Sequence, residues 1–161
     1  MQHCSTVAAA AAAGASLVAA RAADGAAAVT CTQDVQQQAA HTDLDDLKMV
    51  LCVNQSLKKG KGKIGAQCAH AAICAVLQLL ASDESLFVRW EQCGQRKIVV
   101  KVQDAQCMEA LAAAAAAAGH AAYIMRDAGR TQVAPDSQTV LALGPAPEAE
   151  IDRLTGHLQL L

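Results

Sequence analysis

The pattern of large apolar and polar residues divides the chain into two regions. Residues 1–46 consist mainly of alanine, glycine, glutamine and small polar residues, with few large apolar side chains. Such a segment cannot bury enough apolar surface to support a core of its own. We therefore predict an Ala-rich extension over 1–46, disordered or used for targeting, followed by one folded domain over 47–161.

Four short apolar runs in the second region have the length and composition of β-strands. They lie at residues 48–54, 97–102, 121–125 and 139–143. The first, KMVLCVN, is an apolar run bounded by polar residues. This pattern is typical of a strand that is buried on both faces of a sheet.

Longer segments between these runs predict helices at 63–80, 104–118 and 147–154, with a polar connection at 82–90 that has room for a short helix. Asp104 suits an N-cap and Gly119 a helix stop. The resulting order is β-α-β-α-β-β-α. It predicts an α/β sheet with helices on both faces, and at least one antiparallel strand because the last two strands are joined without a helix.

Charge is distributed unevenly, although the formal net charge is only −2. Residues 47–161 hold 12 Lys and Arg against 10 Asp and Glu, whereas residues 1–46 hold 1 against 5. One cluster places four lysines within six positions: Lys58, Lys59, Lys61 and Lys63. A solvated loop would explain it, but the interleaved glycines favour a loop that neutralises phosphates.

The same loop, GKGKIG, fits the G-x-G-x-x-G pattern of dinucleotide sites. That fingerprint also requires an acid at the end of the second strand, and Asp83 and Glu84 fall in the connection before it. The Walker A pattern has no match either. The loop therefore predicts a phosphate-binding turn at a helix N-terminus without a nucleotide pocket, for which a nucleic-acid backbone is the natural ligand.

Seven cysteines form an odd set without a C-x-x-C pair or an ordered zinc spacing. We expect small buried thiols, no disulfide framework and no metal. Helical spacing places Lys63, Gln67 and His70 on one stripe, while Cys68 points to another face than His70. A cysteine nucleophile activated by this histidine is therefore not expected, and a buried, hydrogen-bonded histidine is the simplest interpretation of His70.

The extension raises a targeting question. Its apolar stretch, residues 7–20, is too short and too weakly hydrophobic for a membrane span, and no basic residue precedes it as in a secretory signal. The first acid is Asp24 and the one arginine is Arg21. An organelle transit peptide and a plain alanine bias both stay open.

Four separated segments occur in order from Leu47 to Leu161 without a large gap. They are KMVLCVNQSLKKGKGKIGAQCAHAA, WEQCGQRKIVVKV, RDAGRTQVAPDSQTVLALGP and IDRLTGHLQLL. Together they resemble the peptidyl-tRNA hydrolase family of the archaeal and eukaryotic type, type 2. The resemblance implies a three-layer α/β/α sandwich with a four-stranded mixed β-sheet, usually as a homodimer. It also implies hydrolysis of the ester bond of peptidyl-tRNA, which releases peptide and free tRNA for reuse in translation.

The resemblance further implies the catalytic positions, which fall on Lys63 or Lys61, His70, Asp127, Thr131 and Thr139. We favour Lys63, because it begins the helix that also carries Gln67 and His70. A carboxylate can orient or deprotonate water, hydroxyls can position it or donate to an oxyanion, and a lysine can stabilise negative charge. Taken without the resemblance, D-A-G-R-T would serve equally well as a capped turn.

Binding of tRNA is expected to be mainly electrostatic, since the chain has three aromatic residues for base stacking. The residues expected to meet its backbone are Lys58, Lys59, Lys61, Arg126 and Arg130. No cofactor is implied. Compared with the family pattern, Asn54 and Ser56 replace a charge pair, and Asp136 stands where glycine is usual, in a turn that aspartate tolerates.

Two other functions stay open at this stage. One is a mitochondria-associated, protein-binding regulator of cell death, as for some animal members of the family, and the other is an RNA-binding module without catalysis. For location we expect the cytoplasm, with the mitochondrion or another organelle as the alternative if residues 1–46 act as a targeting signal.

Overall fold

The computed structural model describes residues 46–127 and 135–161. Its helices and strands follow the predicted order with one helix more. They are β1 (Leu47–Asn54), α1 (Lys61–Ser82), α2 (Glu84–Gln92), β2 (Lys97–Val102), α3 (Ala105–Ala117), β3 (Ala122–Arg126), β4 (Gln138–Pro147) and α4 (Glu148–Thr155).

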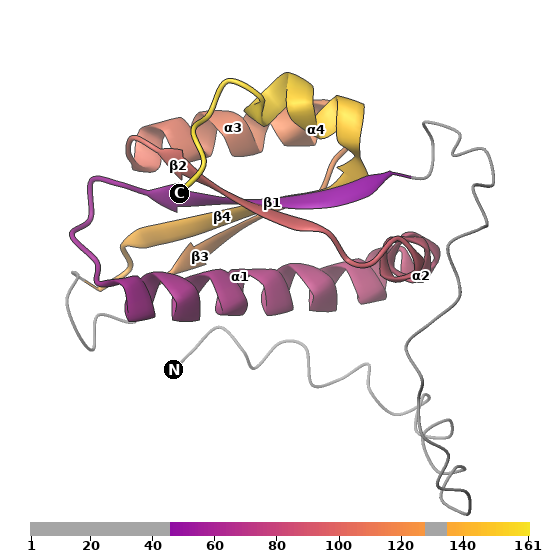
Figure 1. Cartoon of the computed structure of the whole chain (residues 1–161), viewed down its shortest axis with the longest axis horizontal. Helices are drawn as coiled ribbons and strands as arrows, with labels where there is room; N and C mark the ends of the chain where they lie inside the picture. The colour runs from indigo at the N-terminus through magenta and orange to yellow at the C-terminus, as the bar shows by residue number, and fades with distance from the viewer. Residues whose placement is uncertain (1–45, 128–134) are drawn as a thin grey trace, which may run out of the picture. The chain divides into compact units, whose positions relative to one another are not determined.

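The strands form one sheet in the order β2-β1-β4-β3 (Figure 1). Strand β1 pairs with β2 in parallel, while β4 runs antiparallel to both β1 and β3. The sheet is therefore mixed, which confirms the expectation of an antiparallel strand where two strands follow each other without a helix.

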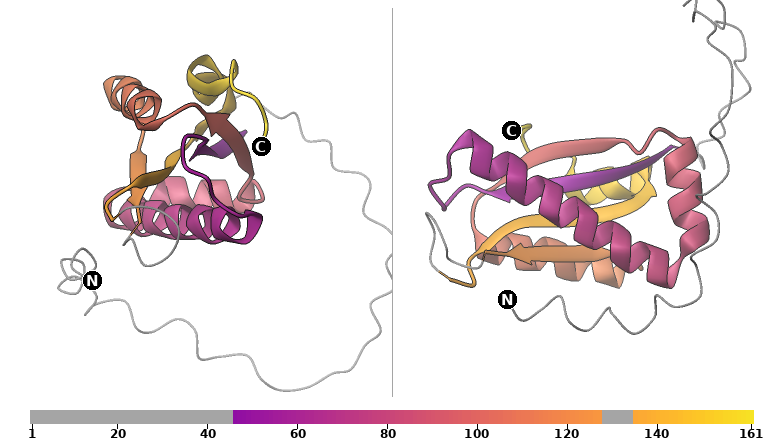
Figure 2. Two further views of the ribbon diagram at one scale, coloured as in Figure 1. Left: turned by 90° about the vertical axis from the view of Figure 1, so that its left-hand side faces the viewer. Right: turned by 90° about the horizontal axis from the view of Figure 1, so that it is seen from below.

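Helices cover both faces of this sheet. Helices α1 and α2 lie on one face and α3 and α4 on the other, as the end-on view in Figure 2 shows. Each face of the sheet has its own hydrophobic core, and alternate residues of β1 contribute to the two cores. Met49 and Leu51 pack on the α1 side, and Val50 and Cys52 pack on the α3 side. Because both faces are buried, β1 has no polar side, and the three-layer α/β/α sandwich is confirmed.

The connection predicted at 82–90 contains a full helix, α2. Asp83 ends α1 and caps α2, since its carboxylate accepts a hydrogen bond from the Leu86 N–H at 3.0 Å. Trp90 is buried under the sheet and donates to the Arg96 carbonyl at 3.3 Å. The sequence allowed a short helix in this connection, and the structure shows that one of its nine residues, Trp90, is buried.

The two ends of α3 follow the predicted signals. Asp104 caps α3 by accepting from the Cys107 N–H at 2.9 Å, and Gly119 ends it with a φ of +79°. Strand β4 is longer than expected and bends near Gly144, which has a φ of +84°. A Cβ there would approach the Lys48 carbonyl oxygen to 2.9 Å, so glycine is required at this bend.

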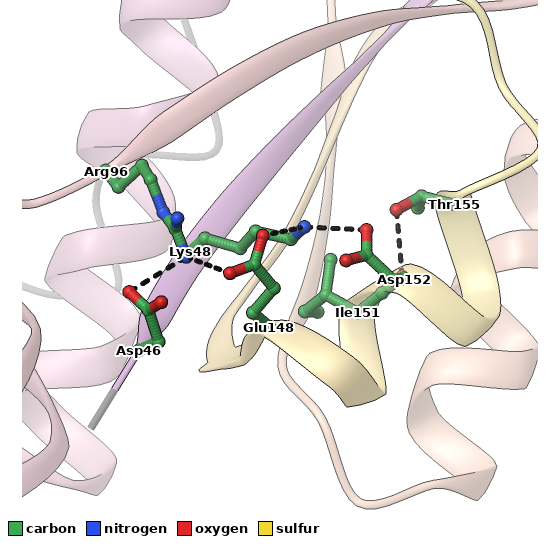
Figure 3. Close-up of polar contacts among 7 residues, drawn as sticks. All are labelled: Asp46, Lys48, Arg96, Glu148, Ile151, Asp152 and Thr155. Carbon is green, nitrogen blue, oxygen red and sulfur yellow. Dashed lines mark hydrogen bonds and ion pairs between the residues drawn. The ribbon is translucent and has the colours of Figure 1, made fainter. Parts of the chain in front are cut away.

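Lys48 differs from its expected place. The sequence put it at the polar boundary of β1, but its side chain is 4% exposed and lies within the strand. Its ammonium is 2.6 Å from Asp152 Oδ1 and 3.1 Å from Glu148 Oε1, both on α4 (Figure 3). Arg96 bridges Glu148 at 2.8 Å and Asp46 at 3.1 Å. We call these five residues the Lys48 cluster; it ties α4 to the starts of β1 and β2.

Candidate active site

The candidate residues meet at one edge of the sheet, where β1 and β3 end and β4 begins. The antiparallel pairing of β4 with its two neighbours brings these three points together. Beyond β3, the Asp127 N–H donates to the Ser137 carbonyl at 2.9 Å, and the Asp136 N–H donates to the Asp127 carbonyl at 2.8 Å. Asp127 is thereby fixed to the sheet. The first turn of α1 faces it, as the side-chain contacts below show.

Asp127 is the centre of the site. Its side chain is only 7% exposed, and its Oδ2 atom lies 3.0 Å from Lys63 Nζ and 2.8 Å from Gln67 Nε2. Lys63 and Gln67 stand four residues apart on α1, so both reach the carboxylate from one face of the helix. A buried carboxylate with a lysine partner and an amide donor is held in one orientation.

Thr139 joins the same group of residues through Gln67. Its hydroxyl donates to Gln67 Oε1 at 2.9 Å, and the Met125 carbonyl lies 3.2 Å from the same hydroxyl. The side chain is 0% exposed, because β4 runs through the middle of the sheet. Lys63, Gln67, Asp127 and Thr139 therefore form one continuous set of contacts, which we call the Asp127 network.

Lys59 lies beside this network and not at the surface of the loop. Its ammonium donates to the Thr139 carbonyl at 3.0 Å, and its side chain is half-buried. Burial lowers the pKa of Lys59; Cys68 and Asp127 oppose this shift, and the neighbouring charge of Lys63 adds to it. Lys59 thus brings a second ammonium to the edge of the Asp127 network.

The remaining basic residues expected to bind tRNA occupy more open positions. Lys58 and Lys61 are exposed. Arg126 forms an ion pair with Asp136 at 2.8 Å. Asp136 itself has a φ of +65°, which confirms that this residue adopts the left-handed turn. Arg130 and Thr131 lie outside the described residues.

The structure does not bring every expected residue together. His70 is exposed on α1, and among the contacts of residues 46–127 and 135–161 none links it to the Asp127 network. This position differs from the buried, hydrogen-bonded histidine that we considered the simplest interpretation. Gln67, conversely, had been placed on the stripe of Lys63 without a role, and it provides the link between Asp127 and Thr139.

Neutral hydrogen bonds hold the loop after β1, where the family pattern has a charge pair. Asn54 is buried, and its Nδ2 donates to the Gln138 carbonyl at 2.9 Å. Its Oδ1 accepts from the Ser56 N–H at 2.9 Å and from the Ser56 hydroxyl at 2.8 Å. Asn54 therefore anchors the start of the loop that carries the lysines to β4 through neutral hydrogen bonds.

The cysteines Cys52 and Cys68 are buried, as small apolar residues are. Within the described ranges, no three His, Cys, Asp or Glu side chains are grouped to hold a metal ion. Cys52 is buried, and burial raises the pKa of its thiol to about 12. Burial also raises the pKa of Cys68. These two thiols stay protonated near neutral pH, which matches the expectation of small buried residues.

These features define an α/β sandwich with a buried, lysine-paired carboxylate at one edge of the sheet. Comparison with known proteins extends this description. The family model described as peptidyl-tRNA hydrolase PTH2 matches residues 47–161. The chain belongs to this family, as the four sequence segments indicated.

Three relatives illustrate the match. The human protein named peptidyl-tRNA hydrolase 2, mitochondrial, is 48% identical over 118 residues, which cover 73% of this chain and 66% of that protein. A probable peptidyl-tRNA hydrolase 2 of Drosophila melanogaster is 47% identical over 117 residues, covering 73% and 63%. The peptidyl-tRNA hydrolase of Thermococcus onnurineus is 40% identical over 114 residues, covering 71% and 97%. The chain thus spans just under two thirds of the length of these eukaryotic relatives.

Proposed function

We propose that this chain hydrolyses the ester bond of peptidyl-tRNA and releases the peptide and free tRNA. The observation that carries the proposal is the Asp127 network: a carboxylate paired with Lys63 at 3.0 Å, in a chain that belongs to the peptidyl-tRNA hydrolase family. Relatives from animals and archaea bear the name of this activity.

In the proposed reaction, Asp127 accepts a proton from a water molecule as the water oxygen bonds to the ester carbonyl carbon. The carbonyl oxygen then carries a negative charge, which the ammonium of Lys63 stabilises. When the tetrahedral intermediate collapses, the bond to the ribose oxygen breaks and that oxygen takes up the proton from Asp127. The products are a free peptide carboxyl group and the tRNA hydroxyl group.

Charge around the first turn of α1 supports a polyanionic substrate. This turn contains Lys61 and Lys63, no acidic residue and no side-chain cap at Gly60. Basic residues at a helix N-terminus oppose the helix dipole and destabilise an isolated helix, whereas a phosphate there is favourable. We propose that exposed Lys58, Lys61 and Arg126 contact the tRNA backbone. Arg130 is proposed for the same role from its sequence position alone.

His70 and Thr131 stay proposals that rest on the family's active-site positions. His70 follows Gln67 by three residues on α1, and its side chain is exposed. Thr131 would complete the site from the segment that follows Asp127. Both are proposed to contact the 3′ end of the substrate.

We also propose that two copies of the chain associate through the outer face of α1. Ile73, Leu77 and Leu80 lie one helical turn apart and are exposed. No Lys, Arg, Asp or Glu occurs between Lys63 and Asp83. By length and composition alone, α1 would also qualify as a membrane-spanning helix. Five of its residues, however, are buried in the fold, so we interpret it as a covering helix with a second apolar face.

Molar mass in solution tests this association. We expect wild-type protein to elute as a dimer and Leu77→Glu as a monomer, because a buried carboxylate would remain unpaired in the interface. Gln78→Glu introduces the same charge at the next, also exposed, position and should leave the dimer intact. A wild-type monomer at all concentrations would rule out the association.

For location, we propose that residues 1–46 direct the chain to the mitochondrion. The support is that mammalian relatives carry the word mitochondrial in their names. Residues 1–46 fused to a fluorescent protein should then colocalise with mitochondria. A diffuse cytosolic signal would favour the cytoplasm and leave the segment as an alanine-rich extension.

Release of free tRNA from N-blocked aminoacyl-tRNA tests the proposed activity. We expect hydrolysis by the full wild-type chain, weaker at higher salt, and its loss in Asp127→Asn and Asp127→Ala with tRNA binding retained. Asp136→Asn is the matched control, since Asp136 is an exposed aspartate paired with Arg126. A folded wild type that releases no tRNA would rule out the activity and favour an RNA- or protein-binding function.

A further inference from the structure

The hydroxyl of Thr139 has no proton to offer to a substrate. A threonine hydroxyl carries one donor. Among the described residues, two atoms lie within hydrogen-bond distance of Thr139 Oγ1: Gln67 Oε1 at 2.9 Å and the Met125 carbonyl oxygen at 3.2 Å. Both are acceptors, so they share or compete for that single proton. With 0% exposure, the side chain also cannot contact a substrate directly.

The orientation of the Gln67 amide follows from its two neighbours. An ionised carboxylate only accepts hydrogen bonds, so the amide NH₂ must face Asp127, at 2.8 Å. The amide oxygen then faces Thr139 and accepts its proton. Reversing the amide would place its oxygen against the carboxylate oxygen, so the contact with Asp127 would have no donor.

Thr139 is itself held firmly. It lies in β4, between β1 and β3, and its carbonyl accepts from the ammonium of Lys59 at 3.0 Å. Its contact with Gln67 therefore connects a rigid point of the sheet to a side chain on α1. Gln67 in turn contacts the same atom, Asp127 Oδ2, that lies 3.0 Å from Lys63.

We propose that Gln67 is a positioning residue that fixes the direction of the Asp127 carboxylate, and that Thr139 acts only through Gln67. This inference rests on the proposed function, in which Asp127 takes the proton from water. Catalysis depends on geometry because a carboxylate that rotates away from the water loses the aligned approach, and small misplacements reduce rates strongly. Lys63 contacts Asp127 from the end of a long, flexible side chain. The Gln67 amide, in contrast, is held by Thr139 at its oxygen and contacts Asp127 through its nitrogen.

Each of the two residues keeps one hydrogen bond when the other is substituted. Without Gln67, the Thr139 hydroxyl keeps the Met125 carbonyl as its acceptor, and Asp127 keeps Lys63. Without the Thr139 hydroxyl, the amide of Gln67 keeps Asp127. Gln67→Met and Thr139→Val are therefore suitable variants, since each preserves the size of the side chain and removes only its polar group.

A double-mutant cycle on the full chain tests the inference. We expect Gln67→Met and Thr139→Val each to lower kcat by about tenfold or less with KM within about twofold, and the double variant to match Gln67→Met. If the two effects multiply instead, Thr139 acts independently of Gln67 and the inference is overturned. An inactive wild type would overturn the proposed function as well, so the two failures are distinguishable.

The pH profile of Gln67→Glu gives a readout that a purely structural role would not change. The introduced carboxyl group, when protonated, can donate to Asp127 and accept from Thr139 as the amide does. When it ionises, two like charges face each other. The rate of the variant relative to wild type should therefore fall as the pH rises through roughly 5 to 8. A constant ratio would show that residue 67 does not contact Asp127 in the working enzyme.

Discussion

Two groups of lysine and carboxylate side chains stand at opposite ends of β1 and β4. At one end the Lys48 cluster joins the start of β1 to α4, near the end of β4, and at the other the Asp127 network joins α1 to the start of β4. Each contains a lysine with little exposed surface, 4% for Lys48 and 14% for Lys63. They differ in how that positive charge is balanced.

The Lys48 cluster contains two cations and three carboxylates: Lys48 and Arg96 against Asp46, Glu148 and Asp152. The Asp127 network with Lys59 contains two ammonium groups and one carboxylate. The first set is fully compensated and needs no ligand. Within residues 46–127 and 135–161, the second set pairs more ammonium groups than carboxylates, an arrangement that favours an anionic substrate.

The two helix starts differ in the same way. The first turn of α4 carries Glu148 and Glu150, which suit the positive end of its dipole. The first turn of α1 carries lysines and no acid. The acids in the first turn of α4 therefore stabilise that helix itself. The lysines in the first turn of α1 instead favour an anion at that helix terminus.

The largest expected effect is on hydrolysis, which should depend on Lys63 and not on Lys48. Lys63→Met should lower kcat/KM by about 10²- to 10³-fold, because the charge on the tetrahedral intermediate loses its cation. Lys48→Met should leave hydrolysis unchanged, since Lys48 lies at the other end of the strand. Steady-state release of tRNA measures both. Lys61→Met is a control for lost loop charge and should change kcat little; equal losses in all three variants would contradict the comparison.

The second effect is on the free energy of unfolding, which should depend on the carboxylates that pair with Lys48. The double variant Glu148→Gln/Asp152→Asn leaves the buried Lys48 ammonium without a carboxylate, and we expect the free energy of unfolding to fall by about 3 kcal/mol. Lys48→Met should cost less, because both carboxylates are partly exposed and can be hydrated. Urea unfolding measures these values. A larger loss in Lys48→Met than in the double variant would show that burial of the ammonium is not the controlling cost.

A third prediction concerns acid. Hydrogen bonds first from Arg96 and then from Lys48 hold the pKa of Glu148 below its ordinary value of 4.5. Because the folded pKa is lowered, its stabilisation is present above pH 4.5 and is lost as the pH falls through the lower folded value. Glu148→Gln should therefore lose less stability than wild type between pH 5 and about pH 3 in urea titrations. Parallel losses in both proteins would exclude this contribution.

The smallest effect distinguishes two adjacent lysines of the loop. Lys58→Gln should reduce the slope of log affinity for tRNA against log salt by about 1 without changing kcat, since Lys58 is exposed. Lys59→Met should change kcat by a few fold and the slope less, since Lys59 is bonded to the Thr139 carbonyl. Filter binding across salt concentrations and tRNA release test the pair. Identical behaviour would contradict the different places given to them.

Sequence alone determined most of the architecture, because its signals are local. The apolar run of β1, the Asp104 cap and the Gly119 stop each depend on neighbours within a few residues. The family's four segments then indicated Asp127, Thr139 and Lys63 as parts of one site. The boundary at residues 46 and 47 and the roles of His70, Thr131 and Arg130 remain predictions.

Only the tertiary structure decided how these side chains are used. Gln67 and Asp127 are 60 positions apart, and Thr139 lies 72 positions from Gln67, so no local pattern could show their contacts. The burial of Lys48 and the anchoring of Lys59 likewise depend on α4 and β4, which are distant in the chain. The sequence shows that a lysine carries a charge but not which group pairs with it. Folding determines whether that charge is neutralised within the protein or remains available to a substrate.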